Sequence, residues 1–500
     1  MGINIRIHNV KNIDDFEFII PTIKGLYALT GENGSGKSTI ISCAAAAFFY
    51  PKSPDDYFGS VREGAFIQFK FNDKTREIKE KNQKWDVPRY REFLGITGFY
   101  EGSIVFGNRF KEIEYSYLNK LNSITKEQVH DASSFVKENL GSILHDNKNY
   151  YHSLYVLNKN VADEKGLKRS TYFFENKGAL INQLKMSTGE NLLLTILNLI
   201  EQRLNKKIYG DIPAFMFLDE IELALHSSAL RRLVFFLNDI AENKNTVVLF
   251  STHSIELIRS ISPNNIFYLQ RHLNGELETI NPCYPVYATR NLESSNYGHD
   301  YIILVEDLLA QKIVERILKE QKLLSNKRIL VIAAGGWSQV LRFAYDMIRS
   351  NLTLCTTKIL IILDKDIKKS VSGYMEKEKI GFSTPINFLP IESLEKYLLE
   401  KLVTTLDINL FRNLNDYLFQ GKSLDEIIKD YNYDIKNGKY KGQTKISNGK
   451  KLYSLLIQEL EKIRQTENEL VSIVIEYLFD KGNFNELITF LKKELTPASK

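Results

Sequence analysis

A nine-residue stretch near the N-terminus restricts the fold more than any other part of the chain. Gly31-Glu-Asn-Gly-Ser-Gly-Lys37-Ser38-Thr39 fits the pattern GxxxxGK[ST], follows the apolar run GLYALT and opens a helical stretch. Glycines in such a loop let backbone N–H groups close around phosphate oxygens, and the helix N-terminus adds a favourable dipole. The pattern therefore predicts an α/β domain that binds ATP. We expect the phosphates and their Mg²⁺ to be held by Asn33, Gly34, Ser35, Gly36, Lys37, Ser38 and Thr39.

A second acidic element follows a short apolar run. Phe215-Met-Phe-Leu is succeeded by Asp219 and Glu220. A buried strand there would bring Asp219 to the metal ion, usually through a water molecule, and would place Glu220 to polarise the attacking water. The metal ligands predicted for the nucleotide are thus Ser38 and Asp219, and the predicted general base is Glu220.

Two further short motifs lie on either side of this acidic pair. Ser187, Gly189 and Glu190 open a helix, and His253 follows the apolar strand TVVLF. Serine with a glutamate three residues later is also a capping box, which satisfies helix N–H groups. The capping and phosphate-binding interpretations are compatible, because a helix N-cap is also where anions bind.

The order of these four motifs resembles the ABC ATPase family over residues 1–290. The resemblance implies that Ser187, Gly189 and Glu190 form a signature motif that holds the γ-phosphate of ATP bound to the opposite protomer, so the chain is expected to be at least a homodimer. It also implies that His253 contacts the γ-phosphate. The family's Q-loop glutamine has no counterpart, because residues 99–110 hold the corresponding position without a Gln.

A second α/β unit is predicted from about residue 298. Its apolar runs are each followed by a helical stretch, which is typical of a parallel sheet covered on both faces. We therefore expect an ATPase domain over residues 1–297 and a parallel α/β domain over 298–500 that becomes helical after about residue 400. Residues 110–160 are polar and favour helix, which predicts a small helical insertion in the first domain.

Acidic residues end two strands of this second unit. Glu306 ends the run that begins at Tyr301, and Asp364 and Asp366 end the run KILIILDKD. Residues two apart in a strand face the same way, and parallel strands end at one edge of the sheet, where ligand sites form. Carboxylates gathered there repel one another unless a divalent cation neutralises them, and oxygen ligands select Mg²⁺ or Mn²⁺.

Glutamate followed by an Asp-x-Asp pair resembles the Toprim domain of topoisomerases, primases and overcoming-lysogenization-defect (OLD) nucleases. The glycine turn at Gly335 and Gly336 and the acidic helix at Glu392 and Glu395 fit this resemblance. It implies that Glu306, Asp364 and Asp366 are catalytic metal ligands. The sequence departs from the family at Asp307 and Ala310, so Glu392 or Glu395 is a candidate to complete the metal site.

Lysines are concentrated in residues 434–451. A loop that follows a phosphate backbone has this composition, and so does a solvated lysine loop. OLD enzymes carry a C-terminal lysine beside their metal ions, which makes Lys450 and Lys451 candidates for that role.

Composition limits the remaining classes. The 500 residues have a net charge of +5, three scattered cysteines and no long uncharged apolar stretch, so we expect a cytoplasmic protein without a zinc site or a membrane span. The leading prediction is an OLD-like ATPase and metal-dependent nuclease acting on DNA or RNA. The resemblance implies a role in antiphage defence, with an additional protein or nucleic-acid regulator. The alternative is an ATP-gated nucleic-acid clamp or sensor whose second domain does not cleave.

Overall fold

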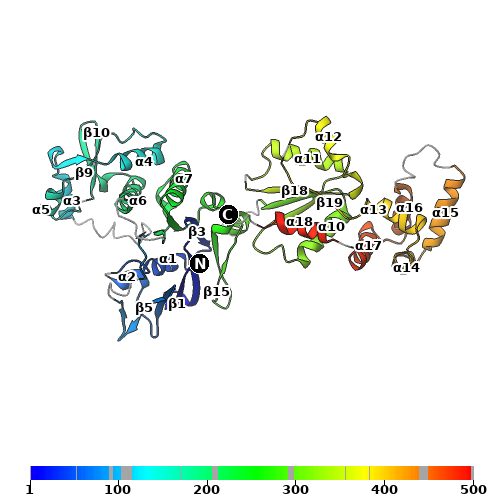
Figure 1. Ribbon diagram of the computed structural model, residues 1–500, viewed down its shortest axis with the longest axis horizontal. Coiled ribbons are helices and arrows are strands. Elements are labelled where there is room, and N and C mark those ends of the chain that lie inside the picture. The colour runs from blue at the N-terminus through cyan, green and yellow to red at the C-terminus, as the bar shows by residue number, and fades with distance from the viewer. Residues whose placement is uncertain are drawn as a thin grey trace. The chain divides into compact units, whose positions relative to one another are not determined.

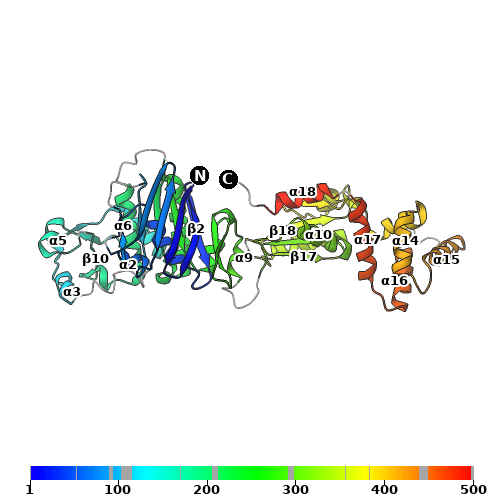
Figure 2. The same ribbon diagram turned by 90° about the horizontal axis from the view of Figure 1, so that it is seen from below.

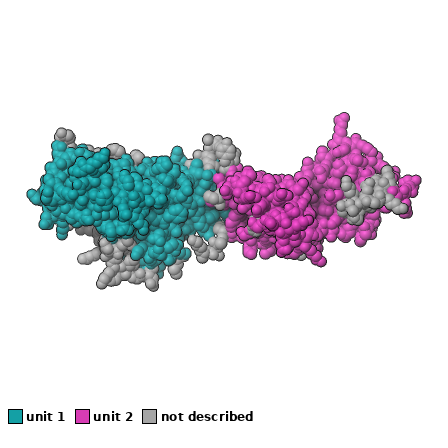
Figure 3. Space-filling view, turned by 90° about the horizontal axis from the view of Figure 1, so that it is seen from above, with its two compact units in different colours: residues 1–296 teal, residues 297–500 magenta. Residues whose placement is uncertain are grey.

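The computed structural model divides into two compact units, Met1–Asn296 and Tyr297–Lys500, which we describe separately (Figure 3). The residues described are 2–51, 53–88, 94–102, 115–168, 170–204, 212–290, 298–354, 356–381, 383–438, 449–482 and 484–496.

The first unit is built on a six-stranded sheet with the order β15-β14-β3-β13-β12-β7 (Figure 1). All neighbouring strands are parallel except β14 and β15. Strands β3, β12 and β13 are buried along their whole length, which explains why their sequences are apolar without alternation. The strand bounds are β3 Gly25–Gly31, β7 Gly98–Glu101, β12 Ala214–Leu218, β13 Thr246–Ser251, β14 Ile266–Arg271 and β15 Leu277–Ile280.

An antiparallel sheet with the order β2-β1-β4-β5-β6 packs beside it (Figure 2). Ile3, Ile5 and Ile7 alternate with exposed or half-exposed residues along β1, so one face of this sheet joins a core with helix α1. The bounds in this layer are β1 Gly2–Val10, β2 Ile13–Pro21, α1 Lys37–Ala45, α2 Pro54–Phe58, β4 Phe66–Phe71, β5 Lys74–Lys81 and β6 Lys84–Asp86.

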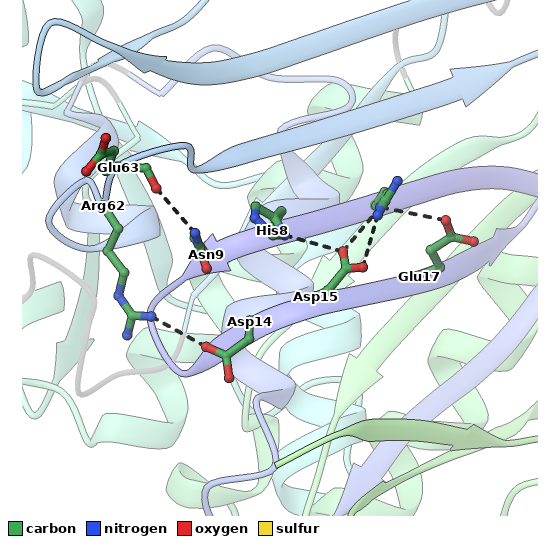
Figure 4. Close-up of polar contacts among 8 residues, drawn as sticks. His8, Asn9, Asp14, Asp15, Glu17, Arg62 and Glu63 are labelled. Carbon is green, nitrogen blue, oxygen red and sulfur yellow. Dashed lines mark hydrogen bonds and ion pairs between the residues drawn. The ribbon is translucent and has the colours of Figure 1, made fainter. Parts of the chain in front are cut away.

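Charged side chains cover the outer face of the β1–β2 hairpin (Figure 4). Arg6 pairs with Asp15 at 3.0 Å and with Glu17 at 3.8 Å, and Arg62 pairs with Asp14 at 3.6 Å. Exposed ion pairs of this kind contribute about 0–1 kcal/mol each, so the buried face of the sheet dominates its stability.

The predicted helical insertion at residues 110–160 is confirmed in part, because the region contains the helices Tyr115–Asn122 and Ser134–His145 but also two strands. Strands β8 and β9 lie in this region and pair with β10 and β11 to form a four-stranded antiparallel sheet. The short strands gave no clear alternation in the sequence, and their partners come later in the chain. We call residues 115–182 the accessory subdomain. Its elements are α3 Tyr115–Asn122, β8 Val129–Asp131, α4 Ser134–His145, β9 Leu154–Leu157, α5 Lys159–Lys165, β10 Tyr172–Asn176 and β11 Ala179–Asn182.

Helices α4, α6 and α7 share a core with the central sheet. Helix α7 buries one stripe of apolar residues that includes Leu230, Leu233 and Leu237, as expected for an amphipathic helix on a sheet. The remaining helices of the unit have the bounds α6 Thr188–Leu204, α7 Ser227–Asn243, α8 Ile255–Arg259 and α9 Pro285–Thr289.

The second unit contains a four-stranded sheet with the order β17-β16-β18-β19, and all its strand pairs are parallel. The predicted parallel α/β arrangement is therefore confirmed for this part of the chain. Its elements are β16 Tyr301–Val305, α10 Leu308–Glu320, β17 Ile329–Ala333, α11 Trp337–Arg349, β18 Lys358–Leu363, α12 Val371–Lys377 and β19 Ile386–Phe388.

The remaining elements in the described part of this unit are helices, as the sequence predicted. They are α13 Leu394–Leu399, α14 Ile408–Tyr417, α15 Leu424–Lys436, α16 Lys450–Lys462, α17 Glu467–Lys481 and α18 Asn485–Glu494. None of the helices in the described residues is long and apolar enough to cross a membrane.

Candidate nucleotide site and acidic cluster

The phosphate loop joins β3 to α1, which is the context that its sequence requires. Gly34 and Gly36 have φ angles of 77° and 96°, a left-handed conformation that favours glycine. Asn12 fixes the loop from outside, because its Nδ2 donates to the carbonyl of Gly34 at 2.8 Å. Gly36 caps α1 without a side chain, so the loop and the first turn of the helix present their backbone to the same place.

Lys37 lies folded over this loop and is only 5% exposed. Its Nζ donates to the carbonyls of Gly31 and Glu32 at 3.1 and 2.9 Å. Burial lowers the pKa of Lys37 to about 8, and the carboxylate of Glu220, followed by that of Asp219, opposes this shift. A buried cation held by backbone carbonyls is a good partner for an anionic phosphate.

Asp219 and Glu220 follow β12 directly, and Ser251 at the end of β13 connects them. The Ser251 hydroxyl donates to Asp219 Oδ1 and accepts from the backbone N–H of Glu220, which lies at 3.0 Å. Asp219 is 4% exposed. Glu220 has φ 51°, a left-handed conformation that is unusual for a residue other than glycine.

A third acid of this site, Glu222, was missed in the sequence. Its Oε1 accepts from the Thr252 hydroxyl at 2.9 Å and from the His253 backbone N–H at 2.6 Å. Burial raises the pKa of Glu222, whereas burial and then the charge of Lys37 lower the pKa of His253. Glu222 therefore holds the segment that carries His253 against the acidic end of β12.

The residues predicted to form the signature motif lie at the start of α6. The backbone N–H and hydroxyl of Ser187 both donate to Glu190 Oε2 at 2.7 Å, and the Glu190 N–H returns a bond to the Ser187 hydroxyl at 3.3 Å. The capping-box interpretation is thus confirmed. Gly189 packs against the 3-10 turn Ile221–Ala224, because a Cβ at this position would lie 2.7 Å from the Ala224 carbonyl oxygen.

A cavity of about 810 Å³ opens beside the phosphate loop, and its walls include Ser38, Thr39, Glu101 and Asp219. Glu101 ends β7, and its carbonyl accepts from the Asp219 N–H at 3.0 Å. Glu101 belongs to the segment in which a Q-loop glutamine was sought. Residues 103–110 of that segment lie outside the described residues.

In the second unit, Glu306 turns its carboxylate onto two neighbouring chain segments. Oε1 accepts from the Asp364 N–H at 2.8 Å, and Oε2 accepts from the Trp337 N–H at 3.1 Å. The glycine turn lies here as well, since the Gly335 N–H donates to the Glu306 carbonyl at 3.1 Å. Burial raises the pKa of Glu306.

The spacing of Asp364 and Asp366 predicted that they share one face of a strand, and this prediction is wrong. Strand β18 ends at Leu363, and Asp366 lies in the 3-10 turn Lys365–Ile367. Burial and then the charges of Glu306, Asp307 and Asp366 raise the pKa of Asp364 to about 8. Asp366 forms an ion pair with Lys396 of α13.

The neighbouring acids have separate partners. Asp307 does not continue a strand but caps α10, accepting from the Ala310 N–H at 2.8 Å. Burial raises its pKa, and Glu395 and Glu467 add to the shift. Glu392 is exposed, and its charge contributes to the raised pKa of Lys396.

Among the described residues, no group of three histidine, cysteine or acidic side chains is arranged to hold a metal ion. The side chains of Glu306 and Asp366 are instead turned toward backbone N–H groups and Lys396, respectively.

Lys450 and Lys451 begin α16 next to this cluster. The preceding residue, Gly449, has φ 78° and approaches the backbone of Glu395 so closely that a Cβ there would lie 2.0 Å from the Glu395 carbonyl oxygen. The two predicted lysines are therefore on an element that contacts the acidic helix. Lysines 439, 441 and 445 lie outside the described residues.

Comparison with known proteins places an ATPase domain in the first unit. Residues 109–259 match the family model described as "AAA domain, putative AbiEii toxin, Type IV TA system". The first unit thus carries an AAA-type ATPase domain. No curated protein matches the sequence.

Solved structures with some similarity include heads of SMC proteins. They include an SMC head bound to the C-winged helix domain of ScpA, at 15% identity and TM-score 0.37, covering 56% of this chain and 98% of that chain. A second is an SMC head with an extended coiled coil bound to the C-terminal domain of ScpA, derived from Pyrococcus furiosus, at 12% identity and TM-score 0.33, covering 56% and 96%. A third is the SMC head domain from Thermotoga maritima, at 13% identity and TM-score 0.30, covering 56% and 99%.

Proposed function

We propose that the first unit binds and hydrolyses ATP with Mg²⁺. The observation that carries this proposal is the buried ammonium group of Lys37, which lies over a left-handed glycine loop and close to the carboxylates of Asp219 and Glu220. A cation buried in this way, at the N-terminus of a helix, is suited to phosphate oxygens.

The residues present fit a nucleotide with its metal ion. Ser38 and Asp219 face one cavity and supply the hydroxyl and carboxylate oxygens that Mg²⁺ prefers. Bound Mg²⁺ would neutralise charge on the phosphates. Lys37 would hold the β- and γ-phosphates, Glu220 would take a proton from the attacking water, and His253 would contact the γ-phosphate.

Two copies of the chain are needed for this proposal. Ser187, Gly189 and Glu190 begin α6 and would contact ATP held by the loop of the partner protomer. We therefore expect ATP to favour a homodimer.

Lys37→Ala tests the ATP site. We expect this variant to lose ATP binding in calorimetry, because it removes the charge that would meet the β- and γ-phosphates. Lys24→Ala is the matched control, since Lys24 is exposed and pairs with Glu242 at 3.5 Å. Wild-type ATP affinity in Lys37→Ala would contradict the assignment.

For the second unit we propose metal-dependent cleavage of nucleic acid, with DNA as the first substrate to test and RNA as the second. Glu306 and Asp364 directly follow the neighbouring parallel strands β16 and β18, and Asp366 lies in the turn after β18. Oxygen donors of this kind fit Mg²⁺ or Mn²⁺. Bound cations would neutralise charge on the phosphodiester. Lys396 would have to leave Asp366 for that carboxylate to become a ligand, with Glu395 or Glu392 as an additional one.

A non-cleaving clamp or sensor is the second candidate, and the same contacts favour it. Both oxygens of Glu306 accept backbone N–H bonds and Asp366 is paired with Lys396, so the acids have partners without metal. Incubation of the protein with plasmid DNA and with RNA, with Mg²⁺ or Mn²⁺ and with or without ATP, separates the two candidates. Cleavage supports the nuclease, whereas ATP-dependent binding without cleavage supports the clamp.

A role in antiphage defence and a regulatory partner remain proposals that follow from the OLD resemblance, and a cytoplasmic location remains a proposal that follows from the composition. Infection of cells that carry wild-type protein or the Lys37→Ala variant tests the first of these.

A further inference from the structure

A chain of hydrogen bonds runs from the signature serine into the accessory subdomain. Ser187 donates twice to Glu190 Oε2 at 2.7 Å. The other oxygen of the same carboxylate, Oε1, accepts from the Tyr151 hydroxyl at 2.6 Å. Tyr151 lies between α4 and β9, so it belongs to the accessory subdomain rather than to the signature helix (Figure 1).

Both the ring and the hydroxyl group of Tyr151 have further contacts. It is 0% exposed, its ring meets Phe174 edge-on at 5.2 Å, and its hydroxyl oxygen lies 3.1 Å from Nε2 of His145. The end of α4 that carries His145 is fixed in turn by Arg232 of α7. This guanidinium donates to two α4 carbonyls, at 2.7 and 2.9 Å.

We infer that Tyr151 is a positioning residue that fixes the signature serine and makes its orientation depend on the accessory subdomain. This inference rests on the ATP-dependent pairing proposed above. A carboxylate has two oxygens in one rigid plane, so fixing Oε1 through Tyr151 also fixes Oε2. The position of Oε2 holds the N–H and hydroxyl of Ser187 in one orientation, from which they would pass to the phosphate on the partner protomer.

The coupling has a consequence for regulation. A ligand or partner that shifts the α4–β9 segment would move Tyr151, release Glu190 and change ATP turnover without touching Lys37. The accessory subdomain and the phosphate of the partner protomer would both act on the first turn of α6, because the bonds that cap this turn include Glu190.

Tyr151→Phe in the full chain is the direct test, with Tyr150→Phe as the matched control. Tyr150 is the adjacent tyrosine, is 45% exposed and stacks on His145 at 3.7 Å, whereas the bond to Glu190 comes from Tyr151. We expect Tyr151→Phe to lower kcat for ATP about tenfold, the effect of losing one hydrogen bond to a charged group. We expect the affinity of dilute protomers for a non-hydrolysable ATP analogue to stay unchanged.

A double-mutant cycle separates positioning from general stability. Ser187→Ala should lower kcat at least as much as Tyr151→Phe, and the double variant should lose little more than Ser187→Ala alone, because both act on one group. The inference would be overturned if the losses of kcat in the two single variants multiplied in the double variant. It would also be overturned if Tyr151→Phe and Tyr150→Phe had the same kcat. Normal turnover in Ser187→Ala would instead locate the failure in the proposed signature site, and the inference would fall with it.

Glu190→Gln provides a second route if Tyr151→Phe unfolds at a lower temperature. In the wild type the two Ser187 donors and the Tyr151 hydroxyl share two charged oxygens, whereas glutamine offers these three donors one neutral acceptor oxygen. The same loss of kcat is expected at an unchanged melting temperature, and wild-type kcat in this variant would also overturn the inference.

Discussion

At the scale of one residue, the role of Glu222 in the proposed ATP site conflicts with its burial. Its carboxylate fixes the backbone of His253, yet it does so in a buried place where burial raises its pKa. An acid whose pKa is higher in the folded protein contributes most to stability below its ordinary pKa. That contribution is lost as the pH rises through the raised value.

Glu222→Gln should therefore stabilise the nucleotide-free protein at neutral pH. The amide oxygen can still accept from Thr252 and His253, but no charge is buried. We expect the unfolding temperature to rise by about 2–4 °C at pH 7–8, which corresponds to about 1 kcal/mol, and the difference from wild type to shrink toward pH 5. Glu242→Gln, at an exposed ion pair, is the control. A destabilised Glu222→Gln protein at pH 8 would show that the charge itself is needed.

Glu220→Gln should bind ATP but hydrolyse it slowly. The amide keeps the size of the side chain but cannot take a proton from water, and loss of a general base costs about 10²–10⁴ in rate. Single-turnover hydrolysis measures this directly. Glu256→Gln is the control, because Glu256 lies on α8 and pairs with Arg231 at 2.8 Å. Similar rates for Glu220→Gln and Glu256→Gln would place the base elsewhere.

At the scale of elements, the contact between α13 and α16 depends on one glycine. A Cβ on Gly449 would lie 2.0 Å from the Glu395 carbonyl oxygen, and its φ of 78° is unfavourable for alanine. We expect Gly449→Ala to destabilise the second unit by about 2–4 kcal/mol in denaturant unfolding, combining the left-handed backbone with overpacking. Gly373→Ala in α12 is the control, since a Cβ there meets nothing within 4 Å. Equal stability of the two variants would mean that the loop before α16 adjusts freely.

Elements whose signals are local could be predicted from the sequence. The patterns that end at Lys37, Asp219 and Glu306 each lie within a few consecutive residues. In the structure, each of these three residues comes shortly after the end of a strand. The accessory sheet could not be predicted in this way. Its strands are three to five residues long, and their sequence order gives little indication that they pair.

The candidate sites show the same limit. Sequence spacing indicated the acids at strand ends, but not that Lys396 would pair with Asp366 or that Tyr151 would reach Glu190. These pairs are separated by 30 and 39 positions, and nothing in either residue type marks the partner. The predicted extended Asp-x-Asp also failed, because a 3-10 turn replaces the last residues of the strand.

At the scale of the whole molecule, the chain carries two groups of buried charge in two compact units. The ATP residues belong to the unit Met1–Asn296, and the acidic cluster belongs to Tyr297–Lys500. Each group has its own counter-charges, Lys37 in the first and Lys396 in the second. Substitutions in one unit should therefore leave the chemistry of the other intact unless the two are coupled through ATP.

Asp364→Asn tests this independence and the nuclease proposal together. We expect ATP hydrolysis to stay within about twofold of wild type, because Lys37, Ser38, Asp219 and Glu220 are untouched. Cleavage of nucleic acid should fall at least about 10²-fold, since a neutral amide is a poor ligand for the cation that would neutralise the phosphodiester. Asp346→Asn on α11 is the control for the loss of one acid from this unit.

Mn²⁺ calorimetry provides the second measurement: binding in wild type and Asp346→Asn but not in Asp364→Asn supports a metal site at the strand ends. Glu395→Gln and Glu392→Gln then identify which helix acid completes it. Full cleavage by Asp364→Asn would remove the acidic cluster from the reaction, and absence of both cleavage and Mn²⁺ binding in wild type would show that these acids do not form a metal site.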